Sequence, residues 1–321
     1  MSLKATESPA RKSGLAGHRS RWFFLSEMLI ERTIALCSFL TIAGVFLILF
    51  TICKEALPVL FRPEDPAHAG LAQFLGSKSW QPVSDIPKYS FIPLIVGTLK
   101  VTLVAIVVAV PIGVLAALFT AEFAPRWVGE WIKPCVELLA GIPSVVMGFF
   151  ALIVLASFLQ SITGSVTRLN ALNAGLALGL AIIPVVYTVS EDALRAVPGN
   201  LREASLALGA NNWKTAIYAV LPAASSGIFA AVILGLGRAV GETMIVLMAS
   251  GNAALTSWNI LDTTRTIPAT IAAELGEVVV GGDHYRILFL LGVLLFGFTL
   301  LLNILARWYL EAMKVRMGGK A

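Results

Sequence analysis

Six apolar runs of about 20 residues or more constrain the fold of this chain more than any other feature of its sequence. A helix rises about 1.5 Å per residue, so roughly 20 residues cross the ~30 Å of hydrocarbon in a bilayer. Charged residues make up 13% of the 321 residues and hydrophobic residues 57%, whereas soluble domains carry about 25% charged residues. The sequence therefore predicts an all-α, polytopic membrane protein. It excludes a soluble enzyme and a secreted scaffold held by disulfides.

The apolar runs also set the expected domain organisation. Six membrane-spanning helices are expected at about residues 33–52, 93–120, 134–159, 171–190, 223–250 and 287–308. They form a membrane domain over residues 33–308, between an N-terminal tail (1–32) and a C-terminal tail (309–321). The longer polar segments between the helices are 54–92, 194–222 and 251–286, and residues 267–280 within the last are expected to be helical.

Lysine and arginine are distributed unequally between the two sides of this layout. With the N-terminus on the inner side, 15 of these residues lie in inner segments and 7 in outer segments. Because cytoplasmic segments carry the excess of Lys and Arg, we expect both termini in the cytoplasm and the protein in the cytoplasmic (inner) membrane. The basic residues are dispersed along loop ends, so a nucleic-acid partner is not expected.

The inner segment 194–222 has the signals of a short helix. Asn200 is expected as its N-cap, with Glu203 completing a capping box, and Gly209 suits a left-handed C-terminal turn. A second helix is expected over 212–220. One small, weakly apolar face of the first helix consists of Leu201, Ala204, Ser205 and Leu208. A two-turn helix is marginal alone, so this segment either rests on its own helical bundle or docks on another protein.

A motif in the same segment favours docking. Glu203-Ala204-Ser205, then Gly209, then Leu221-Pro222, resembles the EAA loop of binding-protein-dependent ABC importer permeases in its residues and spacing. Ser205 and Ala219 depart from the usual Ala and Ile, and both substitutes are small. The resemblance implies the ABC type I importer permease fold and a coupling helix that inserts into a cytoplasmic ATPase. The coupling residues it implies are Glu203, Ala204, Ser205, Leu208, Gly209, Leu221 and Pro222.

No ATP-binding or catalytic motif accompanies this loop. The sequence has no G-x-x-x-x-G-K-[ST] phosphate loop, and its three histidines are far apart, without metal-ligand spacing. We therefore expect no catalytic residue, cofactor site or metal site in this chain, and ATP bound by a separate partner ATPase.

Two ionisable residues, Arg238 and Glu242, lie inside the expected fifth helix. Ionisable residues are costly in a membrane, about 2.5–3.5 kcal/mol on insertion scales, so they are functional candidates by default. A continuous helix would place Arg238 about 2 Å from the midplane and, at i and i+4, both residues on one face. They either form an ion pair that locks the bundle or line a pathway where Arg238 contacts an oxyanion and Glu242 balances its charge. Lys100, in the second helix, either draws anions inward or extends to the membrane surface.

The residues around Arg238 indicate which group of importer permeases the chain resembles. The segment 237–244 (Gly-Arg-Ala-Val-Gly-Glu-Thr-Met) is similar to the R-A-x-G-E-T signature of phosphate-specific permeases, and 139–149 is similar to their third span. Of the two permease types of such systems, the chain resembles the PstC type. The resemblance implies import of inorganic phosphate together with a PstA-type permease, a cytoplasmic ATPase dimer and an extracytoplasmic phosphate-binding protein.

Two other functions stay open from the sequence. A permease for sulfate or molybdate would use a buried arginine in the same way. An ion-coupled secondary transporter would need no EAA loop and often has inverted repeats.

Overall fold

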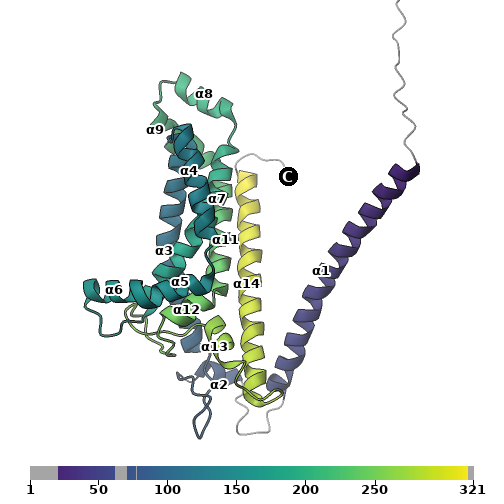
Figure 1. Cartoon of the computed structure of the whole chain (residues 1–321), viewed down its shortest axis with the longest axis vertical. Coiled ribbons are helices and arrows are strands. Elements are labelled where there is room, and N and C mark those ends of the chain that lie inside the picture. Colours follow the sequence, from purple (N-terminus) through teal and green to yellow (C-terminus); the bar gives the residue numbers. More distant parts are fainter. Residues whose placement is uncertain (1–20, 62–70, 77, 317–321) are drawn as a thin grey trace, which may run out of the picture. The chain divides into compact units, whose positions relative to one another are not determined.

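The computed structural model describes residues 21–61, 71–76 and 78–316, and these ranges are almost entirely helical (Figure 1). Five of the described helices are long and apolar enough to cross a membrane, and a bent pair of helices makes a sixth candidate. The chain divides into two units, Met1–Thr51 and Ile52–Ala321. The prediction of an all-α protein with about six membrane spans is confirmed.

Five long helices correspond to apolar runs, and the four that are not part of the bent pair extend beyond the expected bounds. The five are α1 (Arg21–Phe61), α3 (Ile92–Glu122), α7 (Ala171–Arg195), α11 (Ser225–Gly241) and α14 (Asp283–Arg316). The first begins within the expected N-terminal tail, and the last continues into the expected C-terminal tail. The remainder of both tails, 1–20 and 317–321, lies outside the described residues.

Helices α3 and α7 pack closely along their length because glycines remove side chains at their contacts. A Cβ added to Gly175 would lie 2.5 Å from Cγ1 of Val104, and one added to Gly113 would lie 2.9 Å from Cγ1 of Val186. Such separations are shorter than van der Waals contact, so only glycine allows this approach. The two helices therefore form one tightly packed pair.

The third apolar run is not the single helix expected over 134–159. Helix α4 (Arg126–Ala140) ends before Pro143, and a new helical segment runs from α5 (Ser144–Phe150) through a π-helical turn (Ala151–Leu155) to α6 (Ala156–Thr163). Proline has no N–H to donate, and its ring clashes with the preceding turn, so the helix breaks there. The candidate membrane span is 144–163, and α4 precedes it with no buried residue.

The fifth helix also ends earlier than expected. α11 stops at Gly241, Glu242 is extended (φ −70°, ψ 130°), and a separate helix, α12, covers Met244–Ala249. The Glu242 carboxylate accepts a hydrogen bond from the backbone N–H of Ile245 at 3.5 Å. A side chain that caps the following helix competes with continuation of the preceding one, and Gly241 weakens the helix further.

A partly buried polar cluster holds the end of the bundle that lies opposite helix α8 (Gly199–Ala207; Figure 1). Glu274, the last residue of α13 (Ile267–Glu274), lies 2.7 Å from Arg265 Nη1 and 3.2 Å from His284 Nε2, and it accepts a hydrogen bond from Trp80 Nε1 at 3.1 Å. Burial alone would raise the pKa of Glu274, but its contacts with His284, Arg265 and Trp80 lower it below 4.5. The ionised form is therefore the one that the fold stabilises. α13 is shorter than the helix expected over 267–280.

Replacing Glu274 by glutamine should lower the stability of the protein by about 2 kcal/mol at neutral pH, because charged hydrogen-bond partners are lost. A lowered pKa in the folded state gives stability that is present above the ordinary value of 4.5 and lost as the pH falls through the lowered pKa. The difference in Tm between Glu274→Gln and wild type should therefore shrink in acid. Glu277→Gln, at an exposed position, is the control. A Tm unchanged at neutral pH would contradict this role.

Candidate functional site: coupling helix and pathway surface

Helix α8 is the helix predicted within 194–222, with one error at its start. It begins at Gly199 with Pro198 in the N-cap position and no side-chain cap, so Asn200 lies inside the helix and cannot cap it. The predicted capping box of Asn200 and Glu203 is therefore wrong. Gly209 has φ +84° and ends the helix in the left-handed turn that was predicted.

The second predicted helix of this segment is present and slightly longer than expected. It comprises α9 (Asn212–Thr215), a π-helical turn (Ala216–Val220) and α10 (Leu221–Ala223), and it bends by 68° into α11. The Asn211 side chain caps its start by accepting from the Lys214 N–H at 2.8 Å. Leu221 and Pro222 thus lie at the entry to α11.

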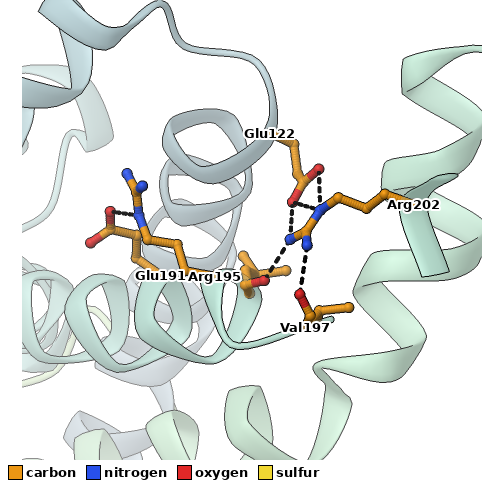
Figure 2. A network of polar contacts seen from close by, with 6 residues as sticks. Glu122, Glu191, Arg195, Val197 and Arg202 are labelled. Carbon is orange, nitrogen blue, oxygen red and sulfur yellow. Dashed lines mark hydrogen bonds and ion pairs between the residues drawn. The ribbon is translucent and has the colours of Figure 1, made fainter. Parts of the chain in front are cut away.

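One arginine fixes α8 to the ends of two long helices (Figure 2). Arg202 donates from Nη2 and Nε to Glu122 Oε1, at 2.8 and 3.2 Å, and from Nε to Oε2 at 3.3 Å. Glu122 is the last residue of α3. The same guanidinium donates to the backbone carbonyls of Leu194 at 2.9 Å and Val197 at 2.6 Å, where α7 ends. This contact supplies the support that a two-turn helix needs.

Two further contacts join α8 to α9 and α9 to the end of α3. The hydroxyls of Ser205 and Thr215 are 2.9 Å apart and connect α8 with α9. The rings of Phe123 and Trp213 lie with centroids 5.6 Å apart, which places α9 against the end of α3. Ser205, which departs from the usual EAA motif, therefore makes a contact that alanine could not make.

The outer face of α8 is uncovered in the isolated chain. No residue of the helix is buried, and the motif residues Glu203 and Ala204 are exposed. Leu206 and Leu208 expose 45% and 90% of their surface. A short helix that presents leucine and alanine at the end of the bundle (Figure 1) can insert into an apolar cleft of another protein.

Arg238 and Glu242 do not share a helix face, because α11 ends between them. Arg238 lies in the last turn of α11 and is exposed, and Glu242 is partly exposed in the break that follows. Among the described residues, none forms an ion pair or hydrogen bond with the Arg238 guanidinium. In the isolated chain, Arg238 and Glu242 therefore do not form an ion pair that locks the bundle, which was one of the two interpretations of these residues.

The packing of α11 against α7 and α3 places Arg238 along the bundle. Gly235, three residues earlier, packs against Ile182 and Val186 of α7 and near Ile106 of α3. These three residues lie about halfway along their helices. Arg238 is then about one helical turn, ~5 Å, further toward the end opposite α8. An exposed arginine thus lies near the middle of the bundle.

Lys100 has a structural role that neither of its two interpretations included. The residue is 2% exposed, and its ammonium donates to the backbone carbonyls of Ser257 and Asn259 at 3.0 and 3.1 Å. It therefore ties α3 to the 251–266 segment, so it is not free to contact a passing anion.

Sequence analysis did not identify a cluster of charged residues near the end of the bundle that carries α8. The side chain of Glu191, in α7, is 1% exposed and accepts a hydrogen bond from Arg195 Nε at 2.5 Å (Figure 2). Its other carboxylate oxygen lies 3.8 Å from Lys133 Nζ. The three residues line a cavity of about 740 Å³ between α3, α4 and α7. Glu191 directly follows the helix expected over 171–190, and the observed α7 continues past it, so its burial was not indicated by the sequence. Nothing local indicated Glu122 as the partner of Arg202 either.

Comparisons with known proteins assign this arrangement to a class. The chain is 35% identical over 265 residues to a phosphate transport system permease protein PstC of Mesorhizobium japonicum, which covers 76% of this chain and 80% of the relative. It is 38% identical over 242 residues to PstC 1 of Mycobacterium bovis, covering 68% and 71%. It is 33% identical over 243 residues to the probable ABC transporter permease YqgH of Bacillus subtilis, covering 76% and 79%.

Solved structures share the fold. A bacterial ABC transporter involved in the import of alginate matches with a TM-score of 0.56 at 18% identity, over 88% of this chain and 98% of that one. The MetNI methionine ABC transporter, in an inward-facing conformation, matches with a TM-score of 0.52 at 21% identity, over 70% and 94%. At these identities the likeness shows the fold of ABC importer permeases.

The family model of the binding-protein-dependent transport system inner membrane component matches residues 109–315. The chain belongs to this family, and it is a multi-pass inner-membrane permease component of an ABC importer. The family works with an ATPase and a substrate-binding protein, and an ion-coupled secondary transporter is not favoured.

Proposed function

We propose that this chain is the PstC-type permease subunit of an ATP-driven importer that moves inorganic phosphate into the cytoplasm. The observation that carries the proposal is the exposed Arg238 near the middle of the bundle, with no described partner. Relatives that are named phosphate transport permeases, at 35% and 38% identity, support phosphate as the anion.

The exposure of Arg238 supports a pathway at this surface. Facing lipid, an arginine at this depth would cost about 2.5–3.5 kcal/mol or more. Gly237 and Gly241 are exposed beside it, and no described atom lies within 4 Å of an added Cβ at either. Small residues at this spacing let a helix of a second permease approach closely. Arg238 would then line a polar path between two subunits, where its planar fork donates to two phosphate oxygens at once.

Glu242 completes this site in the proposal. Its partly exposed carboxylate follows the break after α11, and it would balance the arginine's charge when no anion is bound. Without a nearby carboxylate, Arg238 would hold phosphate too tightly or carry an uncompensated charge when the path is empty.

The proposed complex contains a PstA-type permease, a cytoplasmic ATPase dimer and an extracytoplasmic phosphate-binding protein. Both termini and α8 lie in the cytoplasm. ATP is bound by the ATPase subunits, whose closure moves α8 and turns the pathway outward to accept phosphate, and hydrolysis resets it. This chain contributes no catalytic residue.

A permease for sulfate or molybdate is the second candidate, because a guanidinium donates to any tetrahedral oxyanion. The test is uptake of radiolabelled phosphate by cells that lack other phosphate transporters and express this chain with its partner subunits. We expect ATP-dependent phosphate accumulation that excess unlabelled phosphate abolishes and excess sulfate or molybdate does not. Accumulation of labelled sulfate or molybdate instead of phosphate would contradict the proposal.

A further inference from the structure

Arg202 joins three parts of the molecule that have to move together if α8 drives transport. Its guanidinium contacts the carboxylate of Glu122 at the end of α3 and two carbonyls at the end of α7. The side chains of Arg202 and Glu122 are 26% and 11% exposed, so water screens their contact only partly. The contact is therefore stronger than an ordinary surface ion pair.

The connection between α7 and α8 would be a hinge without these bonds. Only residues 196–198 separate the two helices. Arg202 bonds to Leu194 on one side of this short linker and to Val197 within it. The linker is thereby closed into a hydrogen-bonded loop, and a displacement of α8 is passed to α7 instead of being absorbed in the linker.

The packing of the long helices carries the displacement further. α3 and α7 form the glycine-spaced pair described above, and α11 packs on α7 where Gly235 meets Ile182 and Val186. Arg238 lies one turn beyond Gly235 on the same helix. A continuous set of packed elements therefore connects Arg202 to the proposed pathway surface.

We infer that Arg202 and Glu122 are positioning residues that couple movement of α8 to the pathway, an inference that rests on the proposed function. Arginine suits this position because its planar fork satisfies a carboxylate and two carbonyls together. A lysine ammonium keeps the charge but cannot reproduce this geometry. Loss of the contact should uncouple ATP hydrolysis from transport while the subunit still folds and assembles.

The test uses the complete complex, purified with its partner permease and ATPase and reconstituted in vesicles with its binding protein. The variants are Arg202→Gln, Arg202→Lys and Glu122→Gln. Arg126→Gln is the control, because Arg126 is an exposed cation near the same end that forms no ion pair with a described residue. The readout is phosphate accumulated per ATP hydrolysed, together with the yield of assembled complex.

We expect normal yield and continued ATP hydrolysis, with phosphate per ATP lowered about tenfold in Arg202→Gln and Glu122→Gln, since charged hydrogen bonds are lost. Arg202→Lys should be lowered less, and Arg126→Gln should match wild type. If the Arg202→Gln variant does not assemble, the Glu122→Gln variant tests the inference by itself, because in that variant Arg202 keeps its hydrogen bonds to Leu194 and Val197. An unchanged ratio, or hydrolysis and transport that fall in parallel with yield, would overturn the inference.

This test is separable from the proposed function. If wild-type vesicles accumulate no phosphate, the proposed substrate is wrong. The inference is then decided by the stimulation of ATP hydrolysis that the binding protein, with its own bound ligand, produces. We expect the stimulation to be lost in Glu122→Gln and Arg202→Gln, reduced less in Arg202→Lys and kept in Arg126→Gln. Full stimulation in the variants would contradict the inference.

Discussion

Replacing Ala204 by aspartate is expected to give a permease that inserts normally but loses its ATPase on purification. Ala204 is exposed on α8, whose residues are all unburied in the isolated chain. If this face enters a close-fitting cleft, a carboxylate there is desolvated without a partner, at a cost of several kcal/mol. Binding of the ATPase should weaken by about 100-fold or more. The measurement is co-purification of the ATPase with the tagged permease.

The matched control for this substitution is Ala204→Ser. Serine adds one small polar atom without charge, and Ser205 already occupies the neighbouring position. We expect Ala204→Ser to retain the ATPase. Normal recovery of the ATPase with Ala204→Asp would show that α8 does not dock through this face.

The second large effect is expected at Arg238. Arg238→Glu places an acidic group where the proposed anion passes, so phosphate uptake should fall by about 100-fold or more, because an attraction is replaced by repulsion. Arg238→Lys keeps the charge but loses the planar guanidinium, whose paired N–H groups can donate to two oxygens. This variant should transport phosphate about tenfold more slowly. Uptake is measured in cells without other phosphate transporters, with subunit levels checked by immunoblot. Equal uptake by wild type and Arg238→Glu would remove Arg238 from the pathway.

The long helices were predictable because hydropathy is a local property of the chain. The fourth run was expected to begin at residue 171, where α7 begins. The breaks were not predictable in the same way, because the apolar runs continue through both of them. The helix expected over 134–159 ran through Pro143 without a break. Glu242 was expected to share a helix face with Arg238, whereas its carboxylate accepts a bond from the first turn of α12.

The features of the candidate site also fall into local ones, which were predictable, and long-range contacts, which were not. Gly209 and the α8–α9 order follow from residues close in sequence, and they were predicted. The contact of Arg202 with Glu122 joins residues 80 positions apart, and that of Lys100 with Ser257 joins residues 157 apart. Neither pair carries a local pattern, since each depends on how α3 packs, so sequence reasoning had no means of finding them.

The central claim, that Arg238 contacts the transported anion, is tested most directly by exchanging the two charges. The double variant Arg238→Glu/Glu242→Arg keeps the net charge of the pathway surface and any ion pair that these residues form in the assembled complex. We measure uptake of radiolabelled phosphate in cells without other phosphate transporters, normalised to assembled complex. We expect the exchanged protein to stay inactive, because a carboxylate then stands where phosphate must bind. Uptake close to that of wild type would contradict it and show that the two residues only hold the bundle together.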